Sequence, residues 1–239
     1  MARKDIAFQN HLFSLSYELT NVKAEKSILF LHGWGSSKEA MKNAFAHQFQ
    51  TYKHIYVDLP GFGNSSQDMV LDTYDYACII SFFLKQLGCE PTIIVGHSFG
   101  GKVATLMNPS KLVLLSSAGI IIPKSWKIKT KIRLYKTLKP LFPQHFYKFF
   151  AAKDVEGLSK PMYEVFKKVV DEDFSDIFAK REKETYIFWG KDDVATPLNS
   201  GKTIHKLIKN SHFFALEGGH FFFLKQGNKI ATLIEESAV

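Results

Sequence analysis

The sequence predicts an α/β fold in which a mostly parallel sheet carries helices on both faces. Short apolar runs alternate along the chain with longer segments whose apolar residues recur at helical spacing, and glycine-marked turns separate the two. Several of the runs are apolar throughout, as strands buried on both faces require. The chain has 239 residues, 46% hydrophobic and 23% charged, which is enough for one α/β unit with a large core.

Strands are predicted where apolar runs are bounded by turn residues. They are Leu12–Leu19, Ser27–Leu31, His54–Leu59, Thr92–Val95, Lys111–Ser116, Thr185–Trp189 and His212–Leu216. Segments with the length of a crossover helix lie between them, and Gly88 stands where a helix stop belongs. The clearest predicted helices are Lys38–Phe49, Tyr74–Leu87 and Leu198–Ile208.

The alternation stops between Ile120 and Lys183, where a helix-like stretch interrupted by prolines has no strand pattern. Apolar residues recur there three or four positions apart, which places them on one side of a helix and the lysines on the other. We therefore expect a helical lid insertion over residues 120–183, with the core formed by residues 1–119 and 184–239. The apolar positions of this stripe are Ile128, Ile132, Tyr135, Leu138 and Phe142.

The net charge of +8 is concentrated in one part of the chain. Residues 91–153 contain no Asp or Glu, whereas basic residues crowd the second half of that range. Charge alone does not decide between nucleic acid, anionic lipid and an acidic partner, and no nucleic-acid-binding motif accompanies it. We expect no nucleic-acid partner. The basic residues are Lys124, Lys127, Lys129, Lys131, Arg133, Lys136, Lys139, Lys148 and Lys153.

The sequence contains no pattern typical of a secretory signal or a transmembrane helix. The first ten residues lack an apolar run before a cleavage site. The longest apolar runs are far shorter than the roughly 18 residues that a bilayer span needs. Cys78 and Cys89 fit reduced core thiols better than a disulfide framework. These features predict a soluble cytoplasmic protein.

The strongest chemical signal is the pentapeptide Gly96-His97-Ser98-Phe99-Gly100, which follows a predicted strand and precedes a helix-like segment. A serine on a sharp strand-to-helix turn has crowded backbone, and glycines two positions away on either side let the chain pass close by. Its hydroxyl then projects above the sheet, next to a helix N-terminus that favours negative charge. Ser98 is therefore the candidate nucleophile.

The same stretch also satisfies the spacing of a phosphate-binding loop, because Gly96 is followed by Gly101 and Lys102. Such a loop needs Ser or Thr next, to hold magnesium, and this chain has Val103. The phosphate-loop alternative also assigns no role to the motifs that follow.

A serine hydroxyl needs a base, and the base needs an acid that orients it. Asp192 and Asp193 follow one late predicted strand, and His220 follows the next. Polar side chains just past the carboxyl ends of parallel strands gather at one edge of the sheet. Taken singly, His220 is as well explained as a surface histidine, and Asp193 as a turn residue before Thr196. Together with Ser98 they predict a nucleophile, acid and base in that order along the chain.

Acyl transfer also needs backbone N–H groups that stabilise the oxyanion. One is expected from Phe99, the residue after the nucleophile, and the other from Trp34 in the loop His32-Gly33-Trp34-Gly35. An ordinary tight turn explains the glycines of that loop equally well when they are taken alone.

These motifs, with Asp58-Leu59-Pro60-Gly61-Phe62-Gly63, resemble the landmarks of the α/β-hydrolase family over nearly the whole chain. The resemblance implies that the acid is the last residue of Gly-x-x-Asp with a proline four positions on, which selects Asp193 over Asp192. Other segments are similar to a bacterial branch whose substrates are mostly unassigned: Ser117-Ala118-Gly119, Val165–Phe174 and Ala195-Thr196-Pro197-Leu198.

The expected activity is hydrolysis of a small carboxylic ester or thioester through an acyl-enzyme. Carbon–carbon bond hydrolases of ring-cleavage products are similar overall, but they usually carry Asn where this chain has His97, so ester chemistry is favoured. The resemblance to pimeloyl-carrier methyl esterases with basic lids raises an anionic substrate or an acidic carrier protein as a partner, against the alternative of a merely solvated helix face. A non-catalytic binding protein that uses the basic lid is the alternative from another class. No metal or organic cofactor is expected, since the histidines show no recurring ligand spacing.

Overall fold

A computed structural model describes residues 2–121 and 159–236. In this part of the chain the strands form one sheet in the order β1-β2-β4-β3-β5-β6-β7-β8. Strands β3 to β8 pair in parallel, and the hairpin of β1 and β2 is attached to them antiparallel, through β4. The strands are β1 (Ala2–Phe8), β2 (His11–Thr20), β3 (Ser27–Leu31), β4 (Lys53–Val57), β5 (Ile93–His97), β6 (Lys111–Leu115), β7 (Thr185–Gly190) and β8 (Ser211–Leu216).

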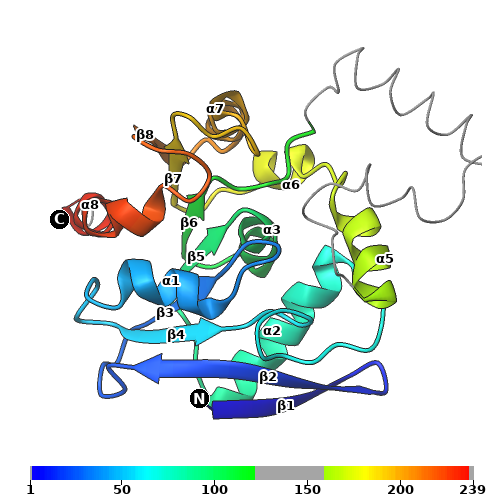
Figure 1. Ribbon diagram of the computed structural model, residues 1–239. Helices are drawn as coiled ribbons and strands as arrows, with labels where there is room; N and C mark the ends of the chain where they lie inside the picture. The colour runs from blue at the N-terminus through cyan, green and yellow to red at the C-terminus, as the bar shows by residue number, and fades with distance from the viewer. Residues whose placement is uncertain (1, 122–158, 237–239) are drawn as a thin grey trace, which may run out of the picture.

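Helices cover both faces of this sheet, as Figure 1 shows. Helices α1 and α8 contact each other on one face, and α2 and α3 contact each other on the opposite face. The mostly parallel α/β architecture predicted from the sequence is confirmed. The helices are α1 (Lys38–Phe45), α2 (Thr73–Leu87), α3 (Phe99–Met107), α5 (Lys160–Val169), α6 (Ser175–Ala179), α7 (Leu198–Leu207) and α8 (Phe223–Glu236).

The core consists of two layers because neighbouring residues of a strand point to opposite faces. In β3, Leu29 and Leu31 pack under α2 and α3, whereas Ile28 and Phe30 pack under α1 and α8. All the residues of β3 are buried, and so are all those of β5 and β7. The continuous apolar runs of the sequence are therefore the central strands of the sheet.

The first strand and the last helix had no predicted counterpart. The β1–β2 hairpin turns at Gln9 and Asn10, which both have positive φ, as a two-residue hairpin requires. Helix α8 runs so close to α1 that a Cβ at Gly227 would lie 2.1 Å from the carbonyl oxygen of Ala44. A glycine within a segment weakens the prediction of a helix from sequence. Here Gly227 is what allows α8 to approach α1 so closely.

The predicted end of the first helix at Phe49 is wrong, because α1 ends at Phe45. Phe49 has φ of 47°, so it cannot continue a right-handed helix. Its ring instead packs against Phe45 and Phe30 in the core.

Part of the predicted lid range, residues 120–183, falls within the described residues and contains helices α5 and α6. Residues 122–158, with the predicted apolar stripe and the cluster of lysines, lie outside the described residues.

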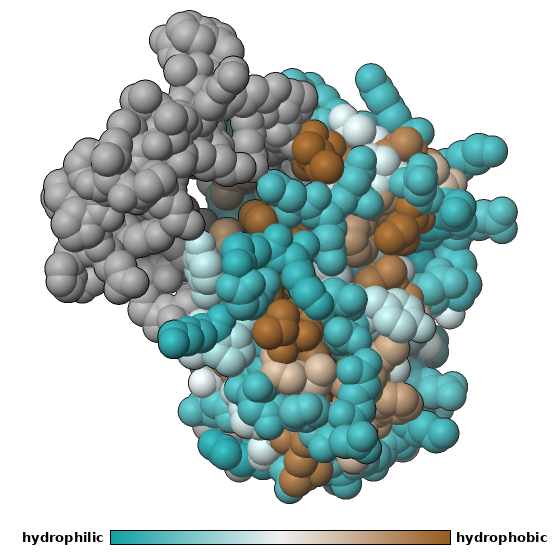
Figure 2. All heavy atoms as spheres, turned by 90° about the vertical axis from the view of Figure 1, so that its right-hand side faces the viewer, coloured by the Kyte–Doolittle hydropathy of each residue, from teal (hydrophilic) through white to brown (hydrophobic). Residues whose placement is uncertain are grey.

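On the face shown in Figure 2, hydrophobic side chains appear as separate spots among hydrophilic ones. Within residues 2–121 and 159–236, no helix combines the length and apolar character needed to cross a bilayer.

Candidate active site

Ser98 lies between β5 and α3 in a strained backbone conformation, with φ of 50° and ψ of −113°. Few residues other than glycine adopt a positive φ, so the surrounding structure has to hold the serine there. Three backbone hydrogen bonds do so. The Ser98 N–H donates to the Leu115 carbonyl over 3.1 Å, and the Ser98 carbonyl accepts from the amides of Gly101 and Ala118 over 3.0 and 3.1 Å. The serine is half-buried on the sharp turn that the sequence predicts.

The glycines on either side of Ser98 are required by close backbone contacts. A Cβ at Gly96 would lie 2.4 Å from the carbonyl oxygen of Gly100, and a Cβ at Gly100 would lie 2.5 Å from that of His32. Neither space accommodates a side chain. The turn and the His32 loop are thus packed directly against each other.

The structure brings Asp193 and His220 together. His220 Nδ1 lies 2.8 Å from Asp193 Oδ2, and the Asp193 side chain is fully buried while that of His220 is 18% exposed. The same oxygen accepts a hydrogen bond from the Thr196 hydroxyl over 2.9 Å. The other oxygen, Oδ1, accepts from the backbone amides of Ala195 and Thr196 at 2.9 Å each.

These contacts keep Asp193 ionised. Burial by itself raises the pKa of the carboxyl, but the hydrogen bond to His220 and those of the Thr196 segment outweigh it and lower the pKa to about 2. The ionised carboxylate accepts a hydrogen bond from the Nδ1–H group, so the proton of a neutral His220 stays on Nδ1 and Nε2 carries a lone pair. Asp192, by contrast, is exposed, and its backbone amide donates to the Gly218 carbonyl over 3.0 Å.

His97 connects the Ser98 turn to the His220 loop. Its Nε2 donates a hydrogen bond to the backbone carbonyl of His220 over 3.0 Å, and the centroids of the two rings lie 4.7 Å apart. Burial, with a contribution from the nearby His220, lowers the pKa of His97 to about 3, so its ring is neutral. In the sequence His97 only favours ester chemistry over carbon–carbon bond cleavage, and no local pattern predicts this contact across 123 residues of chain.

The loop His32-Gly33-Trp34-Gly35 lies against the Ser98 turn. A Cβ at Gly33 would lie 3.1 Å from Ser98 Cβ, and the Trp34 ring centroid is 5.6 Å from that of Phe99. Phe99 is the first residue of α3, where amide groups have no partner within the helix. Both residues predicted to donate to an oxyanion therefore belong to segments that meet beside Ser98.

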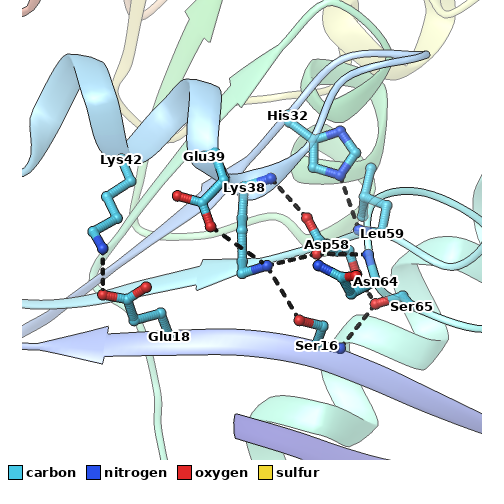
Figure 3. Close-up of polar contacts among 10 residues, drawn as sticks. All are labelled: Ser16, Glu18, His32, Lys38, Glu39, Lys42, Asp58, Leu59, Asn64 and Ser65. Carbon is cyan, nitrogen blue, oxygen red and sulfur yellow. Dashed lines mark hydrogen bonds and ion pairs between the residues drawn. The ribbon is translucent and has the colours of Figure 1, made fainter. Parts of the chain in front are cut away.

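A buried polar network connects this loop to the segment after β4 (Figure 3). Asp58 Oδ2 lies 2.7 Å from Lys38 Nζ, and Asp58 Oδ1 accepts from the Lys38 backbone amide over 2.8 Å. His32 Nε2 accepts from the Leu59 amide over 3.0 Å, while its Nδ1 donates to the Gly33 carbonyl over 2.8 Å. Burial lowers the pKa of His32 to about 4, so it holds both bonds as a neutral ring.

Lys102 does not occupy the position that a phosphate-binding loop requires. Its ammonium group is buried and donates to the Val169 carbonyl over 2.5 Å and to Glu172 Oε2 over 2.6 Å. The loop itself is closed by the contact of Gly96 with Gly100. The geometry of this region argues against the phosphate-loop alternative.

In the described ranges, no group of three or more His, Cys, Asp or Glu side chains is arranged to hold a metal ion.

Comparison with known proteins gives the family. A model of the alpha/beta hydrolase family matches residues 28–232. The uncharacterized hydrolase YugF of Bacillus subtilis is 26% identical over 245 residues, which cover 85% of this chain and 86% of that protein. Lipase 1 of Psychrobacter immobilis is 26% identical over 228 residues, which cover 82% of this chain and 72% of the lipase.

Solved structures share the fold. The esterase EaEST from Exiguobacterium antarcticum superimposes with a TM-score of 0.75 at 22% identity, covering 98% of this chain and 99% of the esterase. At this level of identity the likeness shows the fold alone, so the assignment of the site residues rests on the contacts within this chain.

Proposed function

The chain belongs to the alpha/beta hydrolase family and is a hydrolase, and from this premise we propose that it cleaves a small carboxylic ester or thioester with Ser98 as nucleophile. In this proposal His220 is the base and Asp193 the residue that orients it. The observation that carries the proposal is the Asp193–His220 hydrogen bond of 2.8 Å at the edge of the sheet that also carries the strained Ser98 turn.

The proposed reaction begins when Ser98 Oγ attacks the substrate carbonyl and His220 Nε2 takes its proton. Asp193 holds Nδ1 protonated and stabilises the imidazolium that forms. The four hydrogen bonds on the Asp193 carboxylate leave it one orientation, so the imidazole is aimed before substrate arrives. Breakdown of the tetrahedral intermediate releases the alcohol or thiol with the proton from His220 and leaves Ser98 acylated. Water, activated by the same base, then hydrolyses the acyl-enzyme.

The oxyanion in this scheme is stabilised by the amides of Trp34 and Phe99. Donors of this kind are effective when they are held in place before the charge develops. The contact of Gly33 with Ser98 and the buried bonds of His32 support such a fixed loop. The N-terminus of α3 adds a favourable field at the same place.

The lid also belongs to the proposal. We assign residues 120–183 to an insertion that covers the substrate site and residues 1–119 and 184–239 to the hydrolase core. The proposal that an acidic carrier protein or an anionic substrate binds the basic lid rests on the sequence alone, because the lysines of the lid lie outside the described residues. A cytoplasmic location likewise stays a prediction.

A fluorophosphonate probe followed by mass spectrometry tests the nucleophile. The expected result is covalent labelling confined to Ser98 in the wild-type protein and its loss in Ser98→Ala. Absence of labelling from folded wild-type protein would favour a non-catalytic binding protein. A screen of p-nitrophenyl esters of increasing chain length, run beside a vinylogous diketone, separates ester hydrolysis from carbon–carbon bond cleavage.

A further inference from the structure

We propose that Lys102 and Glu172 form an anchor that holds helix α5 beside the proposed oxyanion loop and thereby determines which acyl groups the enzyme accepts. Lys102 is a positioning residue in this proposal, because it acts through α5. The inference rests on the proposed function and adds a determinant of acyl selectivity to it.

The anchor joins three separate parts of the chain. Lys102 lies in α3, directly after the Ser98 turn, and its Nζ donates to the Val169 carbonyl in the last turn of α5 over 2.5 Å. Nζ also lies 2.6 Å from Glu172 Oε2, and the same carboxylate oxygen accepts a hydrogen bond from the Thr73 hydroxyl at the start of α2. The nucleophile helix is thereby connected to the end of α5 through one ammonium group.

The surroundings of Lys102 keep the ion pair in a single arrangement. The Lys102 side chain is 2% exposed, and its Nζ lies 5.6 Å from the ring centroid of Phe99 and 5.1 Å from that of Phe174. Burial lowers the pKa of Lys102, and the hydrogen bond and charge of Glu172 oppose this. A cation near the N-terminus of α3 is disfavoured by the helix dipole, whereas the C-terminus of α5 favours it. The lysine is therefore stabilised only where the end of α5 and Glu172 meet it.

An apolar side chain would fill this buried space at a lower desolvation cost than a lysine. The ion pair adds a directional constraint, because an ammonium group needs its acceptors at defined positions. An apolar contact would let α5 slide relative to α3. We infer that its contribution lies in the position of α5 rather than in overall stability.

The turns of α5 that precede Val169 reach the proposed oxyanion loop and the segment after β4. The Phe166 ring centroid lies 5.3 Å from that of Trp34, and the space beside Gly61 is filled by Met162, whose Sδ would lie 2.4 Å from a Cβ there. Met162, Val165, Phe166 and Val169 recur at helical spacing and form one stripe of α5. This stripe extends from the anchor to Trp34, so a shift at Val169 would move Phe166 as well.

In the proposed reaction the acyl group on Ser98 lies next to the Trp34 amide. Phe166 and Met162 are then the apolar wall of α5 nearest to that side of the acyl group. A long acyl chain depends on this wall, whereas an acetyl group scarcely reaches it. The anchor should therefore affect long acyl groups more than short ones.

The test compares kcat and KM for p-nitrophenyl acetate and p-nitrophenyl octanoate in Lys102→Met, Glu172→Gln and Lys102→Arg. We expect Lys102→Met and Glu172→Gln to lower the octanoate-to-acetate ratio of kcat/KM by about tenfold, mainly through KM for octanoate. Lys102→Arg keeps the charge and should recover part of that ratio. If Lys102→Met does not fold, Glu172→Gln carries the test, because it preserves the shape of the side chain.

Glu164→Gln is the matched control, because it breaks an ion pair that lies within α5 itself. Glu164 and Lys167 lie 2.6 Å apart, and both side chains are about half exposed, away from the anchor. This variant should keep the wild-type ratio. An unchanged ratio in folded Lys102→Met and Glu172→Gln, or an equal change in Glu164→Gln, would overturn the proposal.

Failure of the anchor and failure of the proposed function give different results. If the probe labels Ser98 as in the wild type and acyl selectivity is unaltered, the anchor proposal alone is wrong. If Ser98 is not labelled and Ser98→Ala retains turnover, the proposed function is wrong, and so is the anchor proposal that rests on it.

Discussion

Two buried carboxylates follow parallel strands of the same sheet, and they differ in how far the side chain that pairs with each is exposed to solvent. Asp58 follows β4 and is bound to Lys38, whose side chain is 1% exposed. Asp193 follows β7 and is bound to His220, whose side chain is 18% exposed. We call Lys38 and Asp58 the closed pair, and Asp193 and His220 the open pair.

The two carboxylates are otherwise alike, because backbone amides and a charged or polar side chain satisfy each of them. In both cases burial raises the pKa and the hydrogen bonds outweigh it, so both pKa values are lowered. A depressed carboxyl pKa therefore does not distinguish a structural pair from a site of chemistry. The distinguishing feature is a partner that is an imidazole, able to accept and donate a proton, and that is partly exposed to solvent. Of the two pairs, only the open pair has such a partner.

The largest effect is expected from His220→Ala, which removes the reachable member of the open pair. Turnover should fall by about 10⁴-fold or more, as in Ser98→Ala, because the nucleophile loses its base. The measurement is kcat on p-nitrophenyl acetate with each purified variant, with circular dichroism as the check of folding. The double variant Ser98→Ala/His220→Ala should be scarcely slower than either single one, and additive losses would contradict a shared role.

Asp193→Asn is expected to lower kcat by roughly 10³- to 10⁴-fold, because the amide no longer holds the imidazole in the required tautomer. Asp192→Asn is the matched control, since Asp192 is the exposed neighbour of the same chemical type. Steady-state kinetics of the two variants, side by side, decide the assignment. A larger loss in Asp192→Asn would mean that the acid was chosen wrongly.

In the closed pair the effect should fall on stability. Asp58→Asn leaves the buried Lys38 ammonium group with the carboxylate of Glu39, 3.7 Å away and partly exposed, as its counter-charge. This loss of the close buried partner should lower the free energy of unfolding by about 3 kcal/mol. Urea unfolding at pH 7 measures this change. Asp193→Asn should destabilise less, because its partner is partly hydrated and can be neutral. Equal losses of stability would erase the distinction between the two pairs.

A smaller effect is expected from pH, through one buried histidine beside each pair. His32, near the closed pair, has a pKa lowered to about 4, and His97, near the open pair, has one lowered to about 3. Both rings are neutral in the fold, whereas the unfolded chain binds protons near 6.5. The contribution of each neutral ring to the free energy of unfolding is therefore fully present above pH 6.5. It is lost as the pH falls from 6.5 toward the pKa of that histidine in the folded protein.

At pH 5 each histidine should reduce the free energy of unfolding by about 2 kcal/mol relative to pH 7. His32→Gln and His97→Gln should each remove one share of this loss, which urea unfolding at the two pH values can measure. An unaltered pH dependence in both variants would show that neither ring is held neutral by burial.

Much of the fold was predictable because its signals are local. The continuous apolar runs that became β3, β5, β6 and β7 need burial on both faces whatever their neighbours are. The Gly96–Gly100 turn was predictable for the same reason, since its glycines and serine have to be adjacent in the chain. Strand β1 and helix α8 were missed because β1 depends on pairing with β2, and α8 on the approach of Gly227 to α1.

The candidate site divides in the same way. The order of Ser98, Asp193 and His220, each after a strand, was readable along the chain, and the structure joins the last two by a hydrogen bond. The roles of Thr196, His97 and Lys38 were not predicted. Lys38 and His97 act on groups that they meet only after folding, and a lysine at the start of a helix or a histidine beside a serine has many other uses. Thr196 lies three residues from Asp193, but a threonine in a turn has many other uses as well.

The sequence by itself determined the parallel sheet with helices on both faces, the sharp turn at Ser98 and the identity of the polar residues at the strand ends, because apolar periodicity and glycine spacing are properties of neighbouring residues. Only the tertiary structure decided that His97 binds the backbone carbonyl of His220, that Lys38 pairs with Asp58, and that Lys102 joins α3 to α5. The physical reason is that hydrogen bonds and ion pairs act over about 3 Å, and only the folded sheet and its covering helices bring such distant residues within that distance.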